Sequence, residues 1–241
     1  MNPLGRRALA ELIGTALLAM AVVGSGIAAQ RLSPGDVGLQ LLENAVATAA
    51  ALAAVILAVG PVSGAHLNPV VTLADRAFGG VSSLEAGVYV TSQVSGAVVG
   101  VMTANLMFDV PAVELSTAVR SSGGLWLGEI VATFGLLLVV FAVVRSGRSS
   151  VAPFAIGAYI GAAYFFTSST AFANPAVTVA RALSDTFAGI AWRSVPAFVA
   201  AQLVGAALAV VVVRLLYPDV ARVAADLVVP HPPPSRLREP V

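Results

Sequence analysis

The chain has 241 residues, of which 58% are hydrophobic and only 10% are charged, and its formal net charge is +1. Soluble domains carry about 25% charged residues, so the composition of this chain predicts a membrane protein rather than a soluble globule. The balanced charge provides no basic surface for nucleic acid. Because the sequence contains no cysteine, disulfides, thiolate metal ligands and a cysteine nucleophile are excluded as well.

Six apolar stretches are long enough to cross a membrane. A helix spans the hydrocarbon core, about 30 Å thick, in about 20 residues. Two further apolar segments have about half that length, so each is predicted to enter the membrane only partway. In chain order, the six predicted spans are roughly Leu9–Ala29, Leu39–Val59, Leu84–Asn105, Leu125–Arg145, Val151–Thr167 and Pro196–Leu216, and the two short segments are Asn68–Phe78 and Asn174–Leu183.

The distribution of arginine around these spans predicts the orientation. An even number of spans puts both termini on one side, and cytoplasmic loops carry an excess of basic residues. We therefore expect a multi-pass protein of the cell's inner (plasma) membrane with both termini in the cytoplasm. Residues 218–241, which include the run His231–Pro234, are predicted to form a disordered cytoplasmic tail. The arginines expected on the cytoplasmic side are Arg6, Arg7, Arg76, Arg145, Arg148 and Arg214, against Arg31, Arg120, Arg181 and Arg193 on the other side.

The two halves of the sequence repeat one another, which is a strong indication of the fold. Each half contains, in the same order, a glutamate, an Asn-Pro pair and a glutamine. Three spans per half is an odd number, so the second copy, about 124–217, must cross the membrane in the opposite sense to the first, about 8–108. Inverted repeats are typical of transport proteins whose site lies where broken helices meet near the midplane. The matching residues are Glu11 with Glu129, Asn68 with Asn174, and Gln93 with Gln202.

Two sequence boxes identify a family. The first is SGAHLNPVVTLA, from Ser63, and the second is FANPAVT, from Phe172. A single Asn-Pro is weak evidence, because Asn caps and Pro begins many ordinary helices. Two copies in matching contexts resemble the signature loops of the aquaporin and glycerol-facilitator (major intrinsic protein) family, and the likeness covers about residues 8–217. The residues of the two boxes are Asn68, Pro69 and Val70, and Asn174, Pro175 and Ala176.

The resemblance implies an all-α membrane fold of six transmembrane helices plus two re-entrant half-helices, forming one channel domain over residues 1–217. It also implies a passive channel rather than an enzyme, a homotetramer in which each subunit has its own pore, and no cofactor. The spans offer no nucleophile–base pair and no metal-ligand cluster. One histidine, His66, cannot form a metal site alone, so we expect it to be a packed loop residue.

The physical argument for a pore is independent of the resemblance. Each Asn-Pro begins a half-helix, so two positive dipole ends would face each other at mid-membrane and oppose cations and protons. The Asn68 and Asn174 amides can donate to a passing oxygen. Irregular backbone is tolerated at this depth only where it lines a wet cavity, so its carbonyls are predicted to line the pore. The residues expected to supply them are Gly64, Ala65 and His66, and Thr170, Ala171 and Phe172.

Two buried acids require an explanation, because a carboxylate in hydrocarbon is by default functional or paired. By resemblance, Glu11 and Glu129 brace the re-entrant loops through hydrogen bonds to backbone N–H groups. The alternative is a proton relay, which would make the chain a proton-coupled secondary transporter using Glu11 or Glu129. Gln93 and Gln202 are interpreted as hydrogen-bonding links between helices.

The predicted selectivity filter departs from the family pattern. The family's usual arginine, three residues after the second box's Asn, is replaced here by Val177. The second-span filter position falls on Thr48 and the loop position on Ala171, whereas the fifth-span position is either Ala162 or Tyr164, depending on the direction of counting. Arg181 lies four residues beyond Val177, where it either supplies charge to the outer vestibule or is a surface arginine.

These features favour a passive transmembrane channel for water and small uncharged solutes, nearer a glycerol facilitator than a strict water pore. A filter of Thr48, Ala171 and Val177 would be wide and weakly polar. A valine at the arginine position also resembles a bacterial subgroup associated with trivalent metalloid exit, and arsenite, As(OH)3, is an uncharged triol at neutral pH. The expected partners are the lipid bilayer and small neutral solutes such as water, polyols and As(OH)3.

Overall fold

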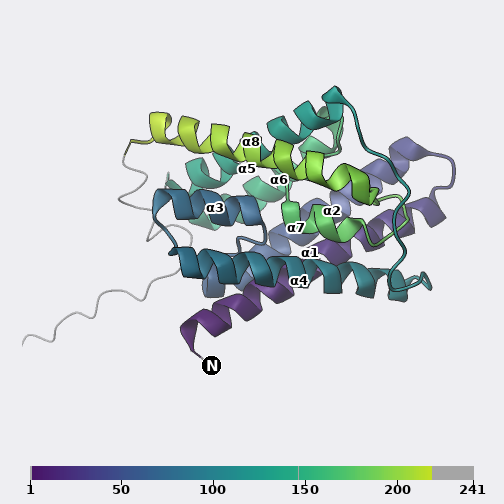
Figure 1. Ribbon diagram of the computed structural model, residues 1–241, viewed down its shortest axis with the longest axis horizontal. Helices are drawn as coiled ribbons and strands as arrows, with labels where there is room; N and C mark the ends of the chain where they lie inside the picture. The colour runs from purple at the N-terminus through teal and green to yellow at the C-terminus, as the bar shows by residue number, and fades with distance from the viewer. Residues whose placement is uncertain (1, 146, 219–241) are drawn as a thin grey trace, which may run out of the picture.

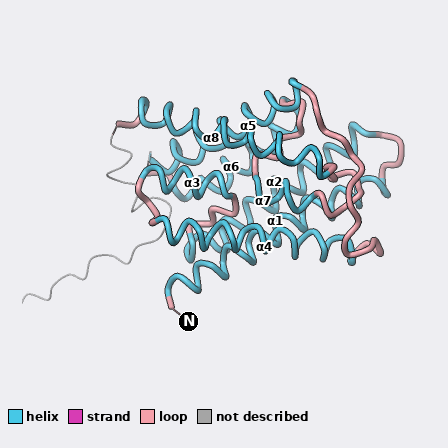
Figure 2. Tube along the Cα trace, viewed as in Figure 1, coloured by secondary structure: helices cyan, strands magenta, loops and turns pink. Residues whose placement is uncertain are grey.

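The computed structural model describes residues 2–145 and 147–218, and these residues form a bundle of helices joined by short loops (Figures 1 and 2). Most of the predicted tail, 218–241, lies outside the described residues. In the described part, six helices are long and apolar enough to cross a membrane, which confirms the predicted all-α membrane fold. Four of these spans lie in α1 (Pro3–Leu32), α2 (Val37–Ser63), α4 (Ser83–Met107) and α5 (Gly123–Arg145). The other two are α6 (Ala152–Phe166) and α8 (Val195–Leu216), each extended at its start by a 3-10 turn, η1 (Ser149–Val151) and η2 (Trp192–Ser194).

Local sequence signals set the helix boundaries. The Asn2 side chain accepts a hydrogen bond from the Gly5 N–H at the start of α1, and Asp36 does the same for Leu39 at the start of α2. Ser82 and Glu85 form a reciprocal capping box at the start of α4. Each of these caps satisfies a backbone donor that would otherwise lack a partner at a helix start.

The two short helices, α3 (Pro69–Phe78) and α7 (Pro175–Arg181), lie inside the bundle, and each begins directly after an Asn-Pro asparagine. We call the end of the bundle where α1 begins and α8 ends the terminal end, and the opposite end, crossed by segment 108–122, the loop end (Figure 1). The helix α3 lies toward the terminal end. The order α1 to α4 is matched by α5 to α8, with a half-helix in third place in each half.

Small residues allow the long helices to approach closely. The helix α1 packs against α4 and α2, and α5 packs against α8. A Cβ atom built on Gly100 would lie 2.1 Å from the Ala16 carbonyl oxygen, and one on Gly96 would lie 2.2 Å from that of Leu12. The second half repeats this contact, because a Cβ on Gly205 would lie 2.5 Å from the Ile130 carbonyl oxygen. Small residues at helix crossings are the usual means of packing helices in lipid.

The close crossing of α1 and α4 predicts a specific sensitivity to substitution. Gly100→Ala should destabilise the protein by about 1–3 kcal/mol, because the added methyl group meets backbone that cannot rotate away. The matched control is Gly87→Ala in the same helix, where a Cβ meets open space. The measurement is thermal unfolding in detergent, and equal unfolding temperatures for the two variants would contradict the packing argument.

Candidate functional site

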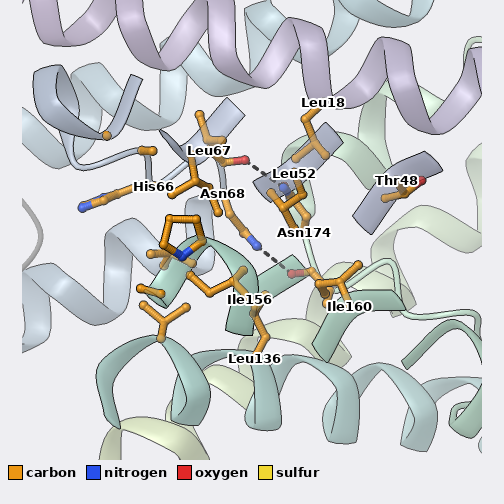
Figure 3. A pocket seen from close by; sticks show the side chains of 18 of the residues that line it. Leu18, Thr48, Leu52, His66, Leu67, Asn68, Leu136, Ile156, Ile160 and Asn174 are labelled. Carbon is orange, nitrogen blue, oxygen red and sulfur yellow. Dashed lines mark hydrogen bonds between the residues drawn. The ribbon is translucent and has the colours of Figure 1, made fainter. Parts of the chain in front are cut away.

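The two asparagines of the Asn-Pro pairs tie the half-helices together, N-terminus to N-terminus. The Asn68 Nδ2 donates to the Ala173 carbonyl over 2.8 Å, and the Asn174 Nδ2 donates to the Leu67 carbonyl over 2.8 Å. Figure 3 shows both hydrogen bonds as dashed lines. Each Oδ1 caps its own half-helix, accepting from Val70 N–H in α3 and from Ala176 N–H in α7.

This arrangement leaves polar donors in the interior of the bundle. Each Asn amide has two N–H groups, and one is used in the cross-link, so the second is available to a solute. Both asparagines line a cavity of about 490 Å³. The positive ends of α3 and α7 meet at this point, which disfavours a cation there while a neutral oxygen can accept a hydrogen bond.

The loops that precede the asparagines have a strained backbone that repeats between the halves. In each loop, the residues that lie four, three and one positions before the asparagine have positive φ angles. For residues other than glycine this conformation costs roughly 1–2 kcal/mol each, so it must be held by its surroundings. The angles are 84°, 49° and 52° at Gly64, Ala65 and Leu67, and 62°, 49° and 45° at Thr170, Ala171 and Ala173.

A buried carboxylate binds the backbone of the first loop. Glu11, which is fully buried, accepts from His66 N–H at 3.0 Å and from Leu67 N–H at 2.7 Å. The same carboxylate accepts from the Ser63 hydroxyl at 2.6 Å and from Gln93 Nε2 at 2.7 Å. Both carboxylate oxygens are therefore engaged by the loop and its supports.

The second loop is bound in the same way. Glu129 accepts from Phe172 N–H and Ala173 N–H, both at 2.9 Å, and from Gln202 Nε2 at 2.6 Å. Thr178, whose hydroxyl donates to the Asn174 carbonyl, also accepts from Gln202.

Two threonines of this network were missed by the sequence reasoning. Thr72 donates to the Asn68 carbonyl and accepts from Gln93, as Thr178 does in the other half. The signal was present, because NPVVT and NPAVT share a threonine at their fifth position.

The cavity passes the asparagine pair and continues on both sides of it. At the terminal end Ser149, Ser150 and Pro153 line it, and beyond the asparagines it reaches Thr48 and Tyr164. In Figure 3, His66 and Thr48 lie on opposite sides of the pair, with mainly aliphatic side chains around it. Of the residues expected to offer carbonyls to the pore, Thr170 is not in the lining of this cavity, whereas Leu67 and Ala173, which were not predicted, are. The loop residues that line it are Gly64, Ala65, His66 and Leu67, and Ala171, Phe172 and Ala173.

The predicted filter residues come together beyond the asparagines. Thr48, Tyr164, Ala171 and Val177 all line the cavity. The Tyr164 hydroxyl donates to the Thr48 hydroxyl over 3.2 Å, which joins α6 to α2. Ala162, the other option for the fifth-span position, is exposed on the outside of the bundle. Of the two options, Tyr164 is therefore the one that faces the cavity.

Arg181 is not a surface residue. Its side chain is only 3% exposed, and it lines the cavity beyond Val177. The guanidinium lies 3.4 Å from the centre of the Phe172 ring, and Nε donates to the Ala188 carbonyl. A second arginine, Arg120, lies 5.2 Å from the same ring. No motif in segment 108–122 indicated that Arg120 would reach this position.

His66 is packed within the first loop. Its Nδ1 lies 3.0 Å from the Thr72 hydroxyl, and its Nε2 lies 3.7 Å from an Asp75 carboxylate oxygen. Among the described residues, no group of three His, Cys, Asp or Glu side chains could hold a metal ion.

Comparisons with known proteins agree with this geometry. The family model described as "Major intrinsic protein" matches residues 2–170 and 164–238. The chain is 46% identical to the aquaglyceroporin AqpS of Rhizobium meliloti over 213 residues, which cover 88% of this chain and 91% of that protein. The chain belongs to the major intrinsic protein family. The family consists of passive membrane channels for water and small solutes rather than of enzymes, and nothing in the comparisons favours a proton-coupled transporter.

More distant members of the family have the same extent and fold. Aquaporin TIP1-2 of Zea mays is 30% identical over 223 residues, which cover 88% of this chain and 86% of that protein. The X-ray structure of the aquaglyceroporin from Plasmodium falciparum superposes with a TM-score of 0.67 at 22% identity. It covers 90% of this chain and 98% of the other. At that identity the superposition shows that this major intrinsic protein has the aquaporin fold.

The carboxylate network predicts that Glu129→Gln destabilises the protein. The glutamine amide would point a donor at the Phe172 or Ala173 N–H, so at least one hydrogen bond to a charged group is lost, at about 1.5–3 kcal/mol. The measurement is thermal unfolding in detergent, with the exposed Glu114→Gln as the control. A Glu129→Gln protein as stable as this control would show that the carboxylate does not hold the loop.

Proposed function

We propose that this chain is a passive channel for water and small uncharged solutes, with glycerol-like polyols and As(OH)3 among its permeants. The observation that carries the proposal is the cavity, which is lined by both asparagines and by the predicted filter residues, with Val177 at the family's arginine position. We place the constriction of the pore at these filter residues. Such a cavity offers a few donors to a neutral hydroxyl and mainly apolar walls to the rest of the solute.

The constriction favours polyols over water alone. Its polar groups are the Thr48 and Tyr164 hydroxyls, which are hydrogen-bonded to each other, and Val177 and Ala171 are small and apolar. A triol can exchange hydrogen bonds with the hydroxyls while its carbon or arsenic centre passes the apolar side. The name of the relative AqpS, an aquaglyceroporin, agrees with this preference.

A proton-coupled transporter is the less favoured function. It would use Glu11 or Glu129 as a relay, yet each carboxylate accepts at least three hydrogen bonds from loop backbone and neighbouring side chains. A relay carboxylate must gain and lose a proton, and doing so here would break bonds that hold the pore loops.

We further propose a plasma-membrane location with both termini in the cytoplasm, and a homotetramer with one pore in each subunit. The arginine distribution supports the orientation, because Arg6, Arg7 and Arg76 lie at the terminal end. The lipid bilayer accounts for the large apolar side chains on the outside of the bundle, among them Leu17, Val46, Phe154, Leu208 and Val211.

The channel function is tested by swelling of reconstituted liposomes in gradients of glycerol and arsenite. The expected flux rises linearly with the gradient and does not require a proton gradient. Vesicles that are no leakier than empty ones would contradict the channel, and a flux that saturates and follows an imposed proton gradient would favour the transporter.

The filter argument predicts the effect of restoring the family's arginine. Val177→Arg should lower the ratio of glycerol to water permeability by at least about tenfold, because a long cationic side chain narrows the constriction. The matched control is Val177→Met, which adds length without charge and should lower the ratio less. Swelling rates in the two gradients measure the ratio, and an unchanged solute ranking in Val177→Arg would contradict the assignment of this position.

A further inference from the structure

We propose that Arg181, supported by Arg120, is the specificity-determining cation of this channel. It takes the place of the family's filter arginine, whose position is occupied here by Val177. The inference rests on the proposed channel function and assigns cation exclusion to a position one helical turn beyond the usual one. Arg181 thereby opposes the passage of protons and other small cations while the constriction itself stays wide.

The first observation is that Arg181 is buried within the bundle and yet lines the pore. It is 3% exposed, and it lines the cavity together with Val177 and Tyr164. A residue four positions after Val177 lies on the same face of the helix, so the charge stays on the path of the solute. The alternative of a surface arginine does not fit this burial.

The second observation is that the guanidinium is held in a fixed orientation. Its centre stacks on the Phe172 ring at 3.4 Å, and Nε donates to the Ala188 carbonyl. These contacts use one face of the planar guanidinium group and one of its N–H donors, so the terminal N–H groups remain available to a solute oxygen. A flexible surface side chain would not hold its charge at one point of the path.

The third observation is that a second cation lies beside the first. Arg120 Nε donates to the Gly189 carbonyl over 2.9 Å and Nη2 donates to the Phe187 carbonyl over 3.3 Å. Arg120 lies 5.2 Å from the Phe172 ring that also carries Arg181. Two guanidinium groups therefore meet at one aromatic ring at the loop end of the pore.

Neither Arg181 nor Arg120 forms a salt bridge in the described part of the chain. The charge of Glu129 acts on both arginines, but its carboxylate is engaged by hydrogen bonds from Phe172, Ala173 and Gln202. A positive charge without an ion-pair partner, beside a largely apolar cavity, acts over a longer range than it would in water, because the surroundings screen it poorly.

The pseudo-symmetry of the fold shows that this charge belongs to one end. The position equivalent to Arg181 in the first half is Asp75, 106 residues earlier. Asp75 is buried, with a carboxylate oxygen 3.7 Å from His66 Nε2, and it is not among the residues lining the cavity. The cationic barrier that we assign to the two arginines is therefore confined to the loop end.

The test uses the full chain in liposomes that contain a pH-sensitive dye. For each variant, proton permeability is divided by glycerol permeability measured on the same vesicles, so the ratio does not depend on the number of folded channels. Arg181→Met, which keeps length and apolar packing, should raise the proton-to-glycerol ratio at least tenfold, equivalent to about 1.4 kcal/mol in the barrier. The exposed Arg193→Met is the matched control and should leave the ratio at the wild-type value.

Three further variants separate the effect of the charge from a merely structural role. Arg181→Lys keeps the charge and should stay within about threefold of wild type. The double variant Arg181→Met with Val177→Arg should lower the proton permeability per reconstituted channel below that of Arg181→Met, because a cation returns to the path. For this variant the reference is the amount of reconstituted protein rather than glycerol flux, since Val177→Arg itself reduces glycerol permeability. Arg120→Met should raise the ratio less than Arg181→Met, since Arg120 is not among the residues that line the cavity.

An unchanged ratio in Arg181→Met, with glycerol flux present, would overturn the proposal. If Arg181→Met does not fold, an unchanged ratio in Arg120→Met together with a raised ratio in Arg181→Lys would overturn it as well, because the charge would then have no effect. Wild-type vesicles without glycerol flux would instead contradict the channel function itself, so the two failures are distinguishable.

Discussion

In the interior of a membrane, backbone N–H groups have no water to bind, and the two re-entrant loops expose several of them. Glu11 and Glu129 accept these hydrogen bonds, and the pore exists because they do. With the N–H groups engaged on one side by a carboxylate, the loop residues next to them can line the cavity on the other. The left-handed backbone that produces this geometry is costly, and the carboxylate network offsets the cost. The asparagines then join the two loops into one unit.

The same network is present in both halves, whereas the charged residue at the end of each half-helix differs. The hydrogen bonds of Glu11, Gln93 and Thr72 repeat in Glu129, Gln202 and Thr178, so they fix the backbone of the two loops in the same way. The end of each half-helix lies outside this network. Asp75 and Arg181 occupy equivalent positions there and carry opposite charges. The hydrogen-bond network is therefore symmetric between the halves, while the charges at the two ends of the pore differ.

Much of the fold was predictable, because span length, the Asn-Pro pairs and the inverted repeat are all local or periodic features. The bounds of α3 and α7 follow directly from Asn68 and Asn174, which cap them. Tyr164 could not be chosen over Ala162 by counting, because the two directions of counting disagree and only the rotation of the helix decides which side chain faces inward. Whether Arg181 faces the vestibule or the surface could not be decided from the sequence, for a similar reason. Its burial depends on Phe172 and on segment 182–191, and neither contact has a sequence signature.

Size selection and charge selection have different ranges, which is why they can be separated in one pore. Steric exclusion acts only at contact. A small Val177 therefore keeps the constriction wide, and this does not depend on where the nearest arginine of the pore lies. Electrostatic repulsion falls slowly, from about 4 kcal/mol at 4 Å to about 2 kcal/mol at 8 Å for an effective dielectric constant of about 20. One helical turn is about 5.4 Å. A guanidinium moved by that distance therefore keeps a substantial part of its effect on a proton or metal cation at the constriction, but it no longer takes up space there. In this chain a neutral triol meets Thr48, Tyr164 and Val177, whereas a cation also meets the field of Arg181.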